Sequence, residues 1–502
     1  MRGNQRTSGE LSRREGGKIF GSGSRTPIAI TLLVKNPSSA GTAKIYYHDI
    51  GDYLSREEKL GKIKGFSSIL SSQMQLSSIT PNEEHDWLNQ RDGLLDTFIP
   101  LEPDKKFNTG SSSVFVLNSM GLGSSRDAWV YNSSLEVLKT NMKRTIDFYN
   151  EQANLWQAAN REEYESVSDF ISTDPTKISW SSSLIPLITK CIPIHFQPEK
   201  IVTAMYRPFF KQNAYIGEKM IHRRGQYDNI FPTPQTKNLV ICVPGIGAKK
   251  GFSALMVDCI PDVQLQYNGQ CFPRYYYEKI DCAELSLFDS GSSEYILHDT
   301  ISDFALERSR EMYGPKVTKD DIFYYIYGLL HSEAYCHRFE ADLTKMLPRI
   351  PLVEDVKVFK AYCTIGKRLA DLHVNYEKAE PWKTLIIVGD IKLTKVEKMR
   401  FAKVNGEDDR RTIILNSQLR VENIPLQAYE YTINGKSALE WIMERYSITT
   451  HTESQIRNDP NTWGHEHDNP LYILDLMQRI ITVSIETLNL VAKLPTLHFP
   501  EI

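Results

Sequence analysis

The stretch Pro27-Ile28-Ala29-Ile30-Thr31-Leu32-Leu33-Val34 is an apolar run flanked by Arg25 and Lys35. A run of this kind, without alternation, is typical of a strand buried on both faces of a parallel or mixed sheet. Residues 44–48 predict a second strand, and a charged helix is expected over residues 55–66. Strand, strand and helix make only part of a doubly wound domain, so we expect the chain to begin in the middle of such a sheet.

The remainder of the chain predicts a larger α+β body. A polar stretch with three prolines at residues 81–112 suggests a boundary, so we expect domains at residues 1–105 and 106–502. Short apolar runs predict strands at residues 238–243, 272–277, 384–388 and 412–415. Apolar periodicity predicts helices at residues 134–160, 319–330, 333–347, 353–376, 435–446 and 471–494.

Composition places this chain among ordinary globular proteins. It has 502 residues, 41% of them hydrophobic and 24% charged, with a net charge of −3 that argues against a uniformly basic nucleic-acid-binding surface. The seven cysteines are scattered and form no C-x-x-C pair, which predicts reduced thiols in the cytoplasm and disfavours a zinc site. No run of eighteen apolar residues predicts a membrane span, and the N-terminus lacks the apolar stretch of a secretion signal.

Positive charge is concentrated between residues 200 and 250. Nine basic residues stand there against Glu218 and Asp228 alone, and aromatic residues lie between them. Such cations can neutralise phosphates while the aromatics pack or stack, although a solvated face over a buried aromatic strip explains the composition equally well. The candidate contacts with a DNA backbone are Arg207, Lys211, Arg223, Arg224, Lys249 and Lys250.

Two glycine-rich segments resemble ligand-binding loops without matching a nucleotide fingerprint. In residues 245–251 the third glycine comes one residue too late for a dinucleotide fold, and Phe252 replaces the Ser or Thr of a P-loop. We therefore expect a lysine-bearing turn against a DNA backbone. Residues 121–127 are expected to be a tight turn before a helix, with a loop for S-adenosylmethionine as the alternative.

Two segments late in the chain have a chemical and a structural interpretation. Residues 469–472, Asn-Pro-Leu-Tyr, approximate the Asn/Asp-Pro-Pro-aromatic loop with which amino-methylating enzymes hold a flipped base. Leu471 replaces the second proline, and Asn469 with Pro470 suits a helix start, so we expect a helix cap. Residues 465–468, His-Glu-His-Asp, are expected to form an exposed turn instead of a metal site.

Several long motifs in order give the chain a specific resemblance. It looks like the C-terminal specificity domain of type ISP restriction-modification enzymes at TAMYRPFFK (residues 203–211), NLVICVPGIG (238–247), DCIPD (258–262), GQCFPRYYY (269–277), DIFYYIYGLLHS (321–332) and NDPN (458–461). The opening, residues 2–6 and 21–35, resembles the last part of that family's N6-adenine methyltransferase domain.

The resemblance implies a C-terminal remnant of a methyltransferase sheet at residues 1–105 and a DNA target recognition domain at residues 106–502. Double-stranded DNA is the implied partner. The resemblance also implies methyltransferase, helicase and nuclease portions and the S-adenosylmethionine that the full enzyme uses. These are expected outside this chain, with a separate chain as one source. We expect no catalytic, cofactor or metal site here.

Two rival hypotheses remain open at this point. In the first, the chain is a complete adenine-N6 methyltransferase, with residues 121–127 holding the cofactor and residues 469–472 holding the base. In the second, it is a specificity subunit that docks onto a separate methyltransferase chain and does not bind DNA by itself. An exposed apolar edge at residues 28–34 favours docking, whereas a cofactor loop that follows a strand and faces the base clamp favours the enzyme.

Overall fold

The computed structural model describes Ile19 and residues 28–38, 41–102, 112–280, 294–391 and 395–500. The chain divides into two compact units, Met1–Gly93 and Leu94–Ile502. The division falls before residue 105 because the segment that follows Gly93 packs into the second unit, where Leu95 and Leu101 are fully buried.

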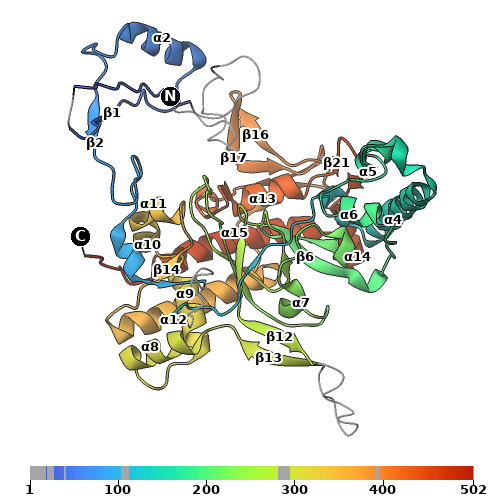
Figure 1. The fold of residues 1–502 in the computed structure, drawn as a ribbon. Helices are drawn as coiled ribbons and strands as arrows, with labels where there is room; N and C mark the ends of the chain where they lie inside the picture. The colour runs from blue at the N-terminus through green and yellow to red at the C-terminus, as the bar shows by residue number, and fades with distance from the viewer. Residues whose placement is uncertain are drawn as a thin grey trace. The chain divides into compact units, whose positions relative to one another are not determined.

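The first unit is small. Strand β1 (Ile45–Tyr47) pairs antiparallel with β2 (Ser77–Ile79). Helix α2 (Arg56–Phe66) begins at Ser55, which forms a reciprocal capping box with Glu58. The predicted second strand and helix are therefore confirmed (Figure 1).

The predicted strand at residues 28–34 is wrong. These residues form no strand, and the side chains of Ile30, Leu32, Leu33 and Val34 are 65–84% exposed. An apolar run becomes a buried strand only where neighbouring segments cover both of its faces. No described segment buries both faces of residues 28–34.

The second unit has a mixed α+β organisation, as predicted, and is built on three four-stranded sheets. The first has the order β10 (Ile260–Pro261), β6 (Ile201–Arg207), β7 (Phe210–Tyr215) and β5 (Tyr131–Asn132). The second runs β4 (Ser119–Met120), β11 (Gln270–Pro273), β8 (Val240–Val243) and β9 (Leu255–Val257). The third runs β15 (Ile386–Gly389), β18 (Leu419–Glu422), β17 (Glu407–Ile414) and β16 (Arg400–Val404).

Among the described residues, this unit also has four two-stranded pairs: β3 (Ile99–Pro100) with β14 (Arg349–Ile350), β12 (Tyr275–Lys279) with β13 (Tyr295–Asp299), β19 (Thr432–Ile433) with β20 (Lys436–Ser437), and β21 (Thr449–Thr450) with β22 (Arg457–Asn458). The single strand predicted at residues 272–277 is in fact two, β11 and β12, which belong to different sheets. The hairpin of β12 and β13 extends away from the body (Figure 1).

Helices cover these sheets and supply most of the core. The longer ones are α4 (Leu135–Ala158), α8 (Asp303–Tyr313), α9 (Lys319–Leu329), α12 (Val356–Val374), α13 (Ala438–Arg445) and α15 (Tyr472–Val491). The shorter ones are α3 (Asp127–Val130), α5 (Val167–Phe170), α6 (Ile185–Thr189), α7 (Tyr227–Ile230), α10 (Glu333–Arg338), α11 (Glu340–Leu343) and α14 (Asn461–Glu466). The helix predicted at residues 333–347 is broken into α10 and α11, which meet at Phe339.

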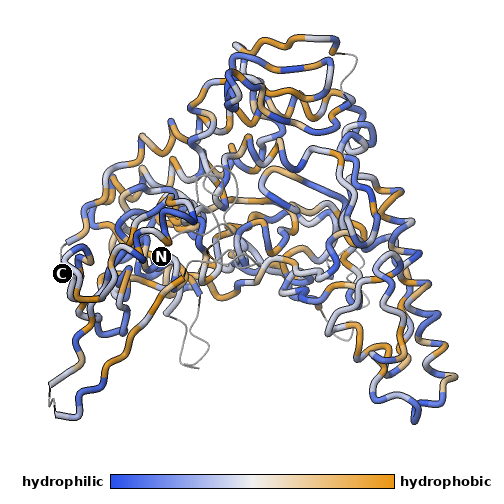
Figure 2. The backbone as a smooth tube through the Cα atoms, turned by 90° about the horizontal axis from the view of Figure 1, so that it is seen from above, coloured by the Kyte–Doolittle hydropathy of each residue, from blue (hydrophilic) through white to orange (hydrophobic). Residues whose placement is uncertain are grey.

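Helices α9 and α12 cross at two glycines. A Cβ on Gly366 would lie 1.9 Å from the carbonyl oxygen of Tyr324 and 2.8 Å from the nitrogen of Gly328. The two backbones therefore approach more closely than any side chain allows, and the residues around them, such as Phe323 and Tyr362, are fully buried. Along the long helix α4 at the right of Figure 2, hydrophobic and hydrophilic residues recur with the turns, as expected for an amphipathic helix.

Within the described ranges, no helix combines the length and the hydropathy that crossing a membrane requires.

Candidate nucleic-acid interface

A cleft of about 900 Å³ opens beside the first sheet. One wall comes from the turn and helix around Ser125–Trp129, with β5 and part of β6 and β7. Another part of the lining comes from the C-terminus of α13 and the segment of β21 and β22. Aromatic, amide, hydroxyl and charged side chains line it, among them Trp129, Asn132, Trp180, Tyr206, Gln212, Arg445, His451 and Asn458. Such a mixture can pack against bases and hydrogen-bond to them.

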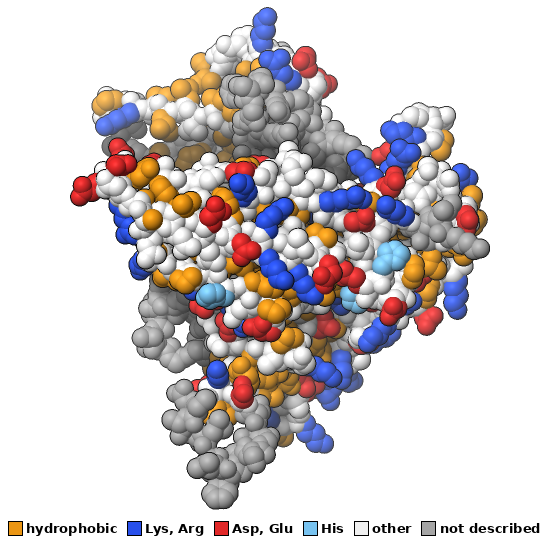
Figure 3. All heavy atoms as spheres, turned by 90° about the vertical axis from the view of Figure 1, so that its right-hand side faces the viewer, with side chains coloured by type: hydrophobic (Ala, Val, Ile, Leu, Met, Phe, Trp, Pro, Cys, Tyr) orange, Lys and Arg blue, Asp and Glu red, His pale blue; other side chains and the backbone are white. Residues whose placement is uncertain are grey.

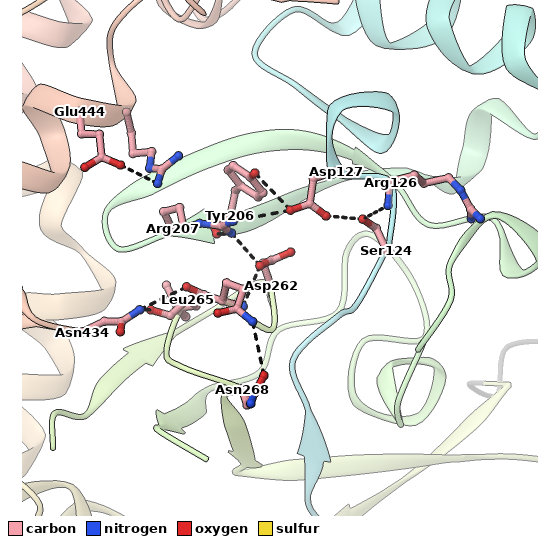
Figure 4. Close-up of polar contacts among 12 residues, drawn as sticks. Ser124, Arg126, Asp127, Tyr206, Arg207, Asp262, Leu265, Asn268, Asn434 and Glu444 are labelled. Atoms are coloured by element: carbon pink, nitrogen blue, oxygen red, sulfur yellow. Dashed lines mark hydrogen bonds and ion pairs between the residues drawn. The ribbon is translucent and has the colours of Figure 1, made fainter. Parts of the chain in front are cut away.

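Below one wall lies a buried ion cluster centred on Arg207, at the end of β6 (Figure 4). Its guanidinium is 2.7 Å from the Asp262 carboxylate and 3.5 Å from that of Asp127. It also covers the ring of Tyr206 at 3.8 Å, and the hydroxyl of Tyr206 donates to Asp127 at 3.2 Å. One arginine therefore connects β6, the segment after β10 and the start of α3, which together shape this wall.

The electrostatics of this cluster follow from its burial. Desolvation raises the pKa of Asp262 to about 7, although the charge of Arg207 opposes the shift. Burial alone would lower the pKa of Arg207, but the charges of Asp262, Tyr206 and Asp127 outweigh it and the pKa is raised. Arg207 therefore stays charged, and its positive charge is paired with carboxylates within the fold.

A second group of cations surrounds Glu444 near the same cleft. Arg445 contacts this carboxylate at 2.7 Å, and Lys436 is ion-paired with it. Lys250 lies beside them: a Cβ on Gly435, whose φ of +78° suits its place in the β19–β20 turn, would be 2.8 Å from Lys250 Cβ. Burial and the neighbouring Lys436 lower the pKa of Lys250, which indicates a local excess of positive charge that an incoming anion would relieve.

The six predicted DNA contacts lie in different environments. Arg223 and Lys249 are exposed, and Lys250 is half-buried. Lys211 is paired with Glu377 at 2.6 Å in the interior, and Arg224 is paired with Asp228 and with the carbonyl of Ile216. Together with Arg207, three of the six candidates therefore hold the fold together.

The structure adds charged residues that sequence reasoning did not select as nucleic-acid contacts, although Asp127 belongs to the segment weighed as a cofactor loop. Asp127, Lys436, Glu444 and Arg445 lie in or near the cleft, although more than 300 residues separate Asp127 from the other three. No local pattern could have found them, because Lys436 and Arg445 stand outside any basic cluster in the sequence. Basic and acidic side chains are interspersed on the face in Figure 3, which agrees with the net charge of −3.

The segments that suggested a methyltransferase are occupied by contacts within the fold. A Cβ on Gly121 would lie 2.5 Å from Val263, so this glycine permits a close approach of two backbone segments. In the other segment the Asn469 side chain accepts from the backbone of Leu471, but the N-cap of α15 is Leu471, so Asn469 forms a turn just before the helix and the predicted cap is wrong in position. The hydroxyl of Tyr472 donates to Glu377 at 2.6 Å.

Residues 465–468, predicted as an exposed turn, are exposed, but the first two end helix α14 and only the last two form a turn; the segment also has a structural role. The Glu466 carboxylate accepts from the backbone nitrogen of Leu135 and from the hydroxyl of Ser134, so it caps helix α4 from a distant part of the chain. The ring of His467 stacks on Trp463. No group of three or more His, Cys, Asp or Glu residues that could hold a metal occurs in the part of the chain that the structure describes.

Comparison with known proteins identifies the family. The family model of the Type ISP C-terminal specificity domain matches residues 113–476. The chain belongs to this family. A search of the curated proteins gave no match.

Three solved structures resemble this Type ISP specificity domain over nearly its whole length. The Type ISP restriction-modification enzyme LlaGI, a nuclease-deletion mutant in complex with a DNA substrate mimic, has 36% identity and a TM-score of 0.84, covering 100% of this chain and 43% of that one. The ATP-dependent Type ISP enzyme LlaBIII bound to DNA has 33% identity and a TM-score of 0.84, with 99% and 30% covered.

The third is the DrdV–DNA complex, with 26% identity and a TM-score of 0.82, covering 99% of this chain and 47% of that one. The chain thus spans less than half the length of each of these proteins.

Proposed function

We propose that this chain recognises the DNA sequence on which a Type ISP restriction-modification enzyme acts. The family match over residues 113–476 carries the proposal. The cleft supports it, because cations near Glu444 and hydrogen-bonding side chains in its lining are what contact with a nucleic acid requires. Adenine methylation with S-adenosylmethionine, DNA translocation and cleavage are then the work of other portions of the enzyme, on this polypeptide or on a separate one.

The basic residues divide into two roles in this proposal. Arg223, Lys249 and Lys250 contact phosphates, because their side chains reach the surface. Arg207, Lys211 and Arg224 position the strands that carry the interface, because each is ion-paired within the fold. Phosphate contacts supply affinity that depends on salt, whereas side chains at the base edges supply sequence choice.

Binding of duplex DNA as a function of salt tests the proposal. We expect the fluorescence anisotropy of a labelled duplex to rise with added protein, and log K to fall linearly with the logarithm of the salt concentration. We also expect a pool of duplexes with a randomised central segment to become enriched in one motif. Binding without any enrichment would contradict target recognition.

The exposed apolar run favours a second candidate function, a docking subunit without DNA binding of its own. Ile30, Leu32, Leu33 and Val34 are each at least 65% exposed. A contiguous apolar surface of this kind is typical of a protein interface. Absence of DNA binding by the folded chain, together with improved solubility when residues 1–93 are removed, would favour docking over recognition.

A further inference from the structure

Two charged side chains that are not among the proposed phosphate contacts line the cleft. Asp127, labelled in Figure 4, projects from the start of α3, and Arg445 lies at the end of α13, next to Glu444 in the sequence. Both line the cleft, and the charge of Asp127 acts on Arg445. They form no ion pair with one another among the described residues, so the negative and the positive group remain available to a ligand between them.

Arg445 is held in place and retains unused hydrogen-bond donors. One terminal nitrogen contacts Glu444 at 2.7 Å, and the guanidinium lies 5.5 Å from the ring centroid of Trp441. Its Nε is buried and has no hydrogen-bond partner among the described residues. A buried Nε is closed to a ligand, so a ligand in the cleft would contact the terminal nitrogens of the guanidinium.

Asp127 is an acceptor fixed by three donors. The hydroxyls of Ser124 and Tyr206 donate to its carboxylate, and Arg207 lies 3.5 Å away. The side chain is nevertheless 36% exposed and lines the cleft. A carboxylate repels a phosphate, so a DNA ligand that approaches Asp127 would meet it with a hydrogen-bond donor such as a base amino group.

We propose that Arg445 and Asp127 read one guanine–cytosine pair in the major groove. Arg445 donates to O6 and N7 of the guanine, and Asp127 accepts from N4 of the cytosine paired with it. In the major groove these acceptor and donor groups lie next to each other on one base pair, which matches one guanidinium and one carboxylate that line the same cleft close enough to interact electrostatically. This inference rests on the proposed function, and it assigns the recognition of one base pair of the DNA target to two residues.

Selection from randomised duplexes by the full chain tests this assignment. Arg445→Lys keeps the positive charge but loses the two-pronged geometry of the guanidinium, and Asp127→Asn removes the carboxylate charge with little change of shape. We expect both variants to lose discrimination by about tenfold or more at the same guanine–cytosine position, with the salt slope of Arg445→Lys unchanged. Glu453→Gln is the matched control, because it removes a carboxylate from an exposed residue of the same cleft.

The outcomes separate the two proposals. If the unmodified chain enriches no motif, the proposed function fails and this inference fails with it. If the chain enriches a motif that Arg445→Lys leaves unchanged, or if the two variants alter different positions, the inference is overturned and the proposed function stands. Thermal unfolding of each variant identifies a folding defect, and Arg445→Lys still decides the question if Asp127→Asn is unstable. An effect of Glu453→Gln on the same position would also overturn the assignment.

Discussion

Arg207 and Asp262 form an ion pair of 2.7 Å in which the Asp262 side chain is 1% exposed and that of Arg207 is 11% exposed. The pair joins the end of β6 to the segment after β10, and β6 and β10 are neighbouring strands of the first sheet. The charge of Arg207, in the most basic segment of the chain, therefore stabilises the fold around the cleft. Burial of such a pair is tolerated only while both partners are present.

Arg207→Ala should destabilise the protein by about 3–5 kcal/mol, because it leaves the Asp262 charge buried without a partner. Chemical denaturation followed by tryptophan fluorescence measures the loss. The double variant Arg207→Ala with Asp262→Asn should recover part of it, since the uncompensated charge is then absent. Equal stability of Arg207→Ala and the unmodified protein would mean that the pair is not formed.

Replacement of both Lys249 and Lys250 by Ala should weaken DNA binding without unfolding the protein. Each phosphate contact that is lost should reduce the log–log salt slope by about 0.9, so the slope should fall by up to about two. Lys249 is exposed and Lys250 is half-buried, so most of the effect should come from Lys249. An unchanged slope in a folded double variant would remove these residues from the interface. Thermal unfolding supplies the control for folding.

Stability should fall as the pH falls from about 6.5 to 4 because of buried histidines. Burial lowers the pKa of His331 to about 4, and burial together with His331 lowers that of His373 well below its usual value. The unfolded chain therefore takes up protons first as the pH drops, so this contribution is complete above about 6.5 and is lost toward pH 4. His331 alone contributes at most about 3 kcal/mol.

The pKa of Asp262, raised to about 7, acts in the opposite direction over the whole of this range. The measurement is therefore the difference in unfolding free energy between the unmodified chain and His331→Gln at each pH. That difference should change between pH 6.5 and 4 and be constant above pH 7. A difference independent of pH would show that His331 is not buried in its neutral form.

Gly366→Ala should destabilise the second unit strongly. The added Cβ would lie 1.9 Å from the carbonyl oxygen of Tyr324, so α9 and α12 would have to separate within a packed core. Overpacking of this kind costs about 1–3 kcal/mol or more, measured as a lower melting temperature. Gly61→Ala in α2 is the control: its Cβ meets nothing within 4 Å, and helix propensity predicts that it stabilises the first unit. Equal effects at the two positions would contradict the close helix crossing.

The sequence by itself determined most of the helices and the family. Helices α4, α9, α12, α13 and α15 were predicted because their apolar residues recur with helical spacing, a property of the local sequence. The family followed from ordered motifs such as residues 203–211 and 238–247, which the match over residues 113–476 confirms. The strand predicted at residues 28–34 failed because burial depends on the segments that surround a run, and the run itself does not specify them.

Only the tertiary structure decided what the charged residues do. Arg207 and Lys249 are both candidate DNA contacts in the same basic segment of the sequence. In the structure Arg207 is paired with Asp262 in the interior, whereas Lys249 is exposed. Asp127 and Arg445 line the same cleft although more than 300 residues separate them in the sequence. The physical reason is that desolvation and pairing, which fix the role of a charge, depend on distances in space that composition and spacing do not contain.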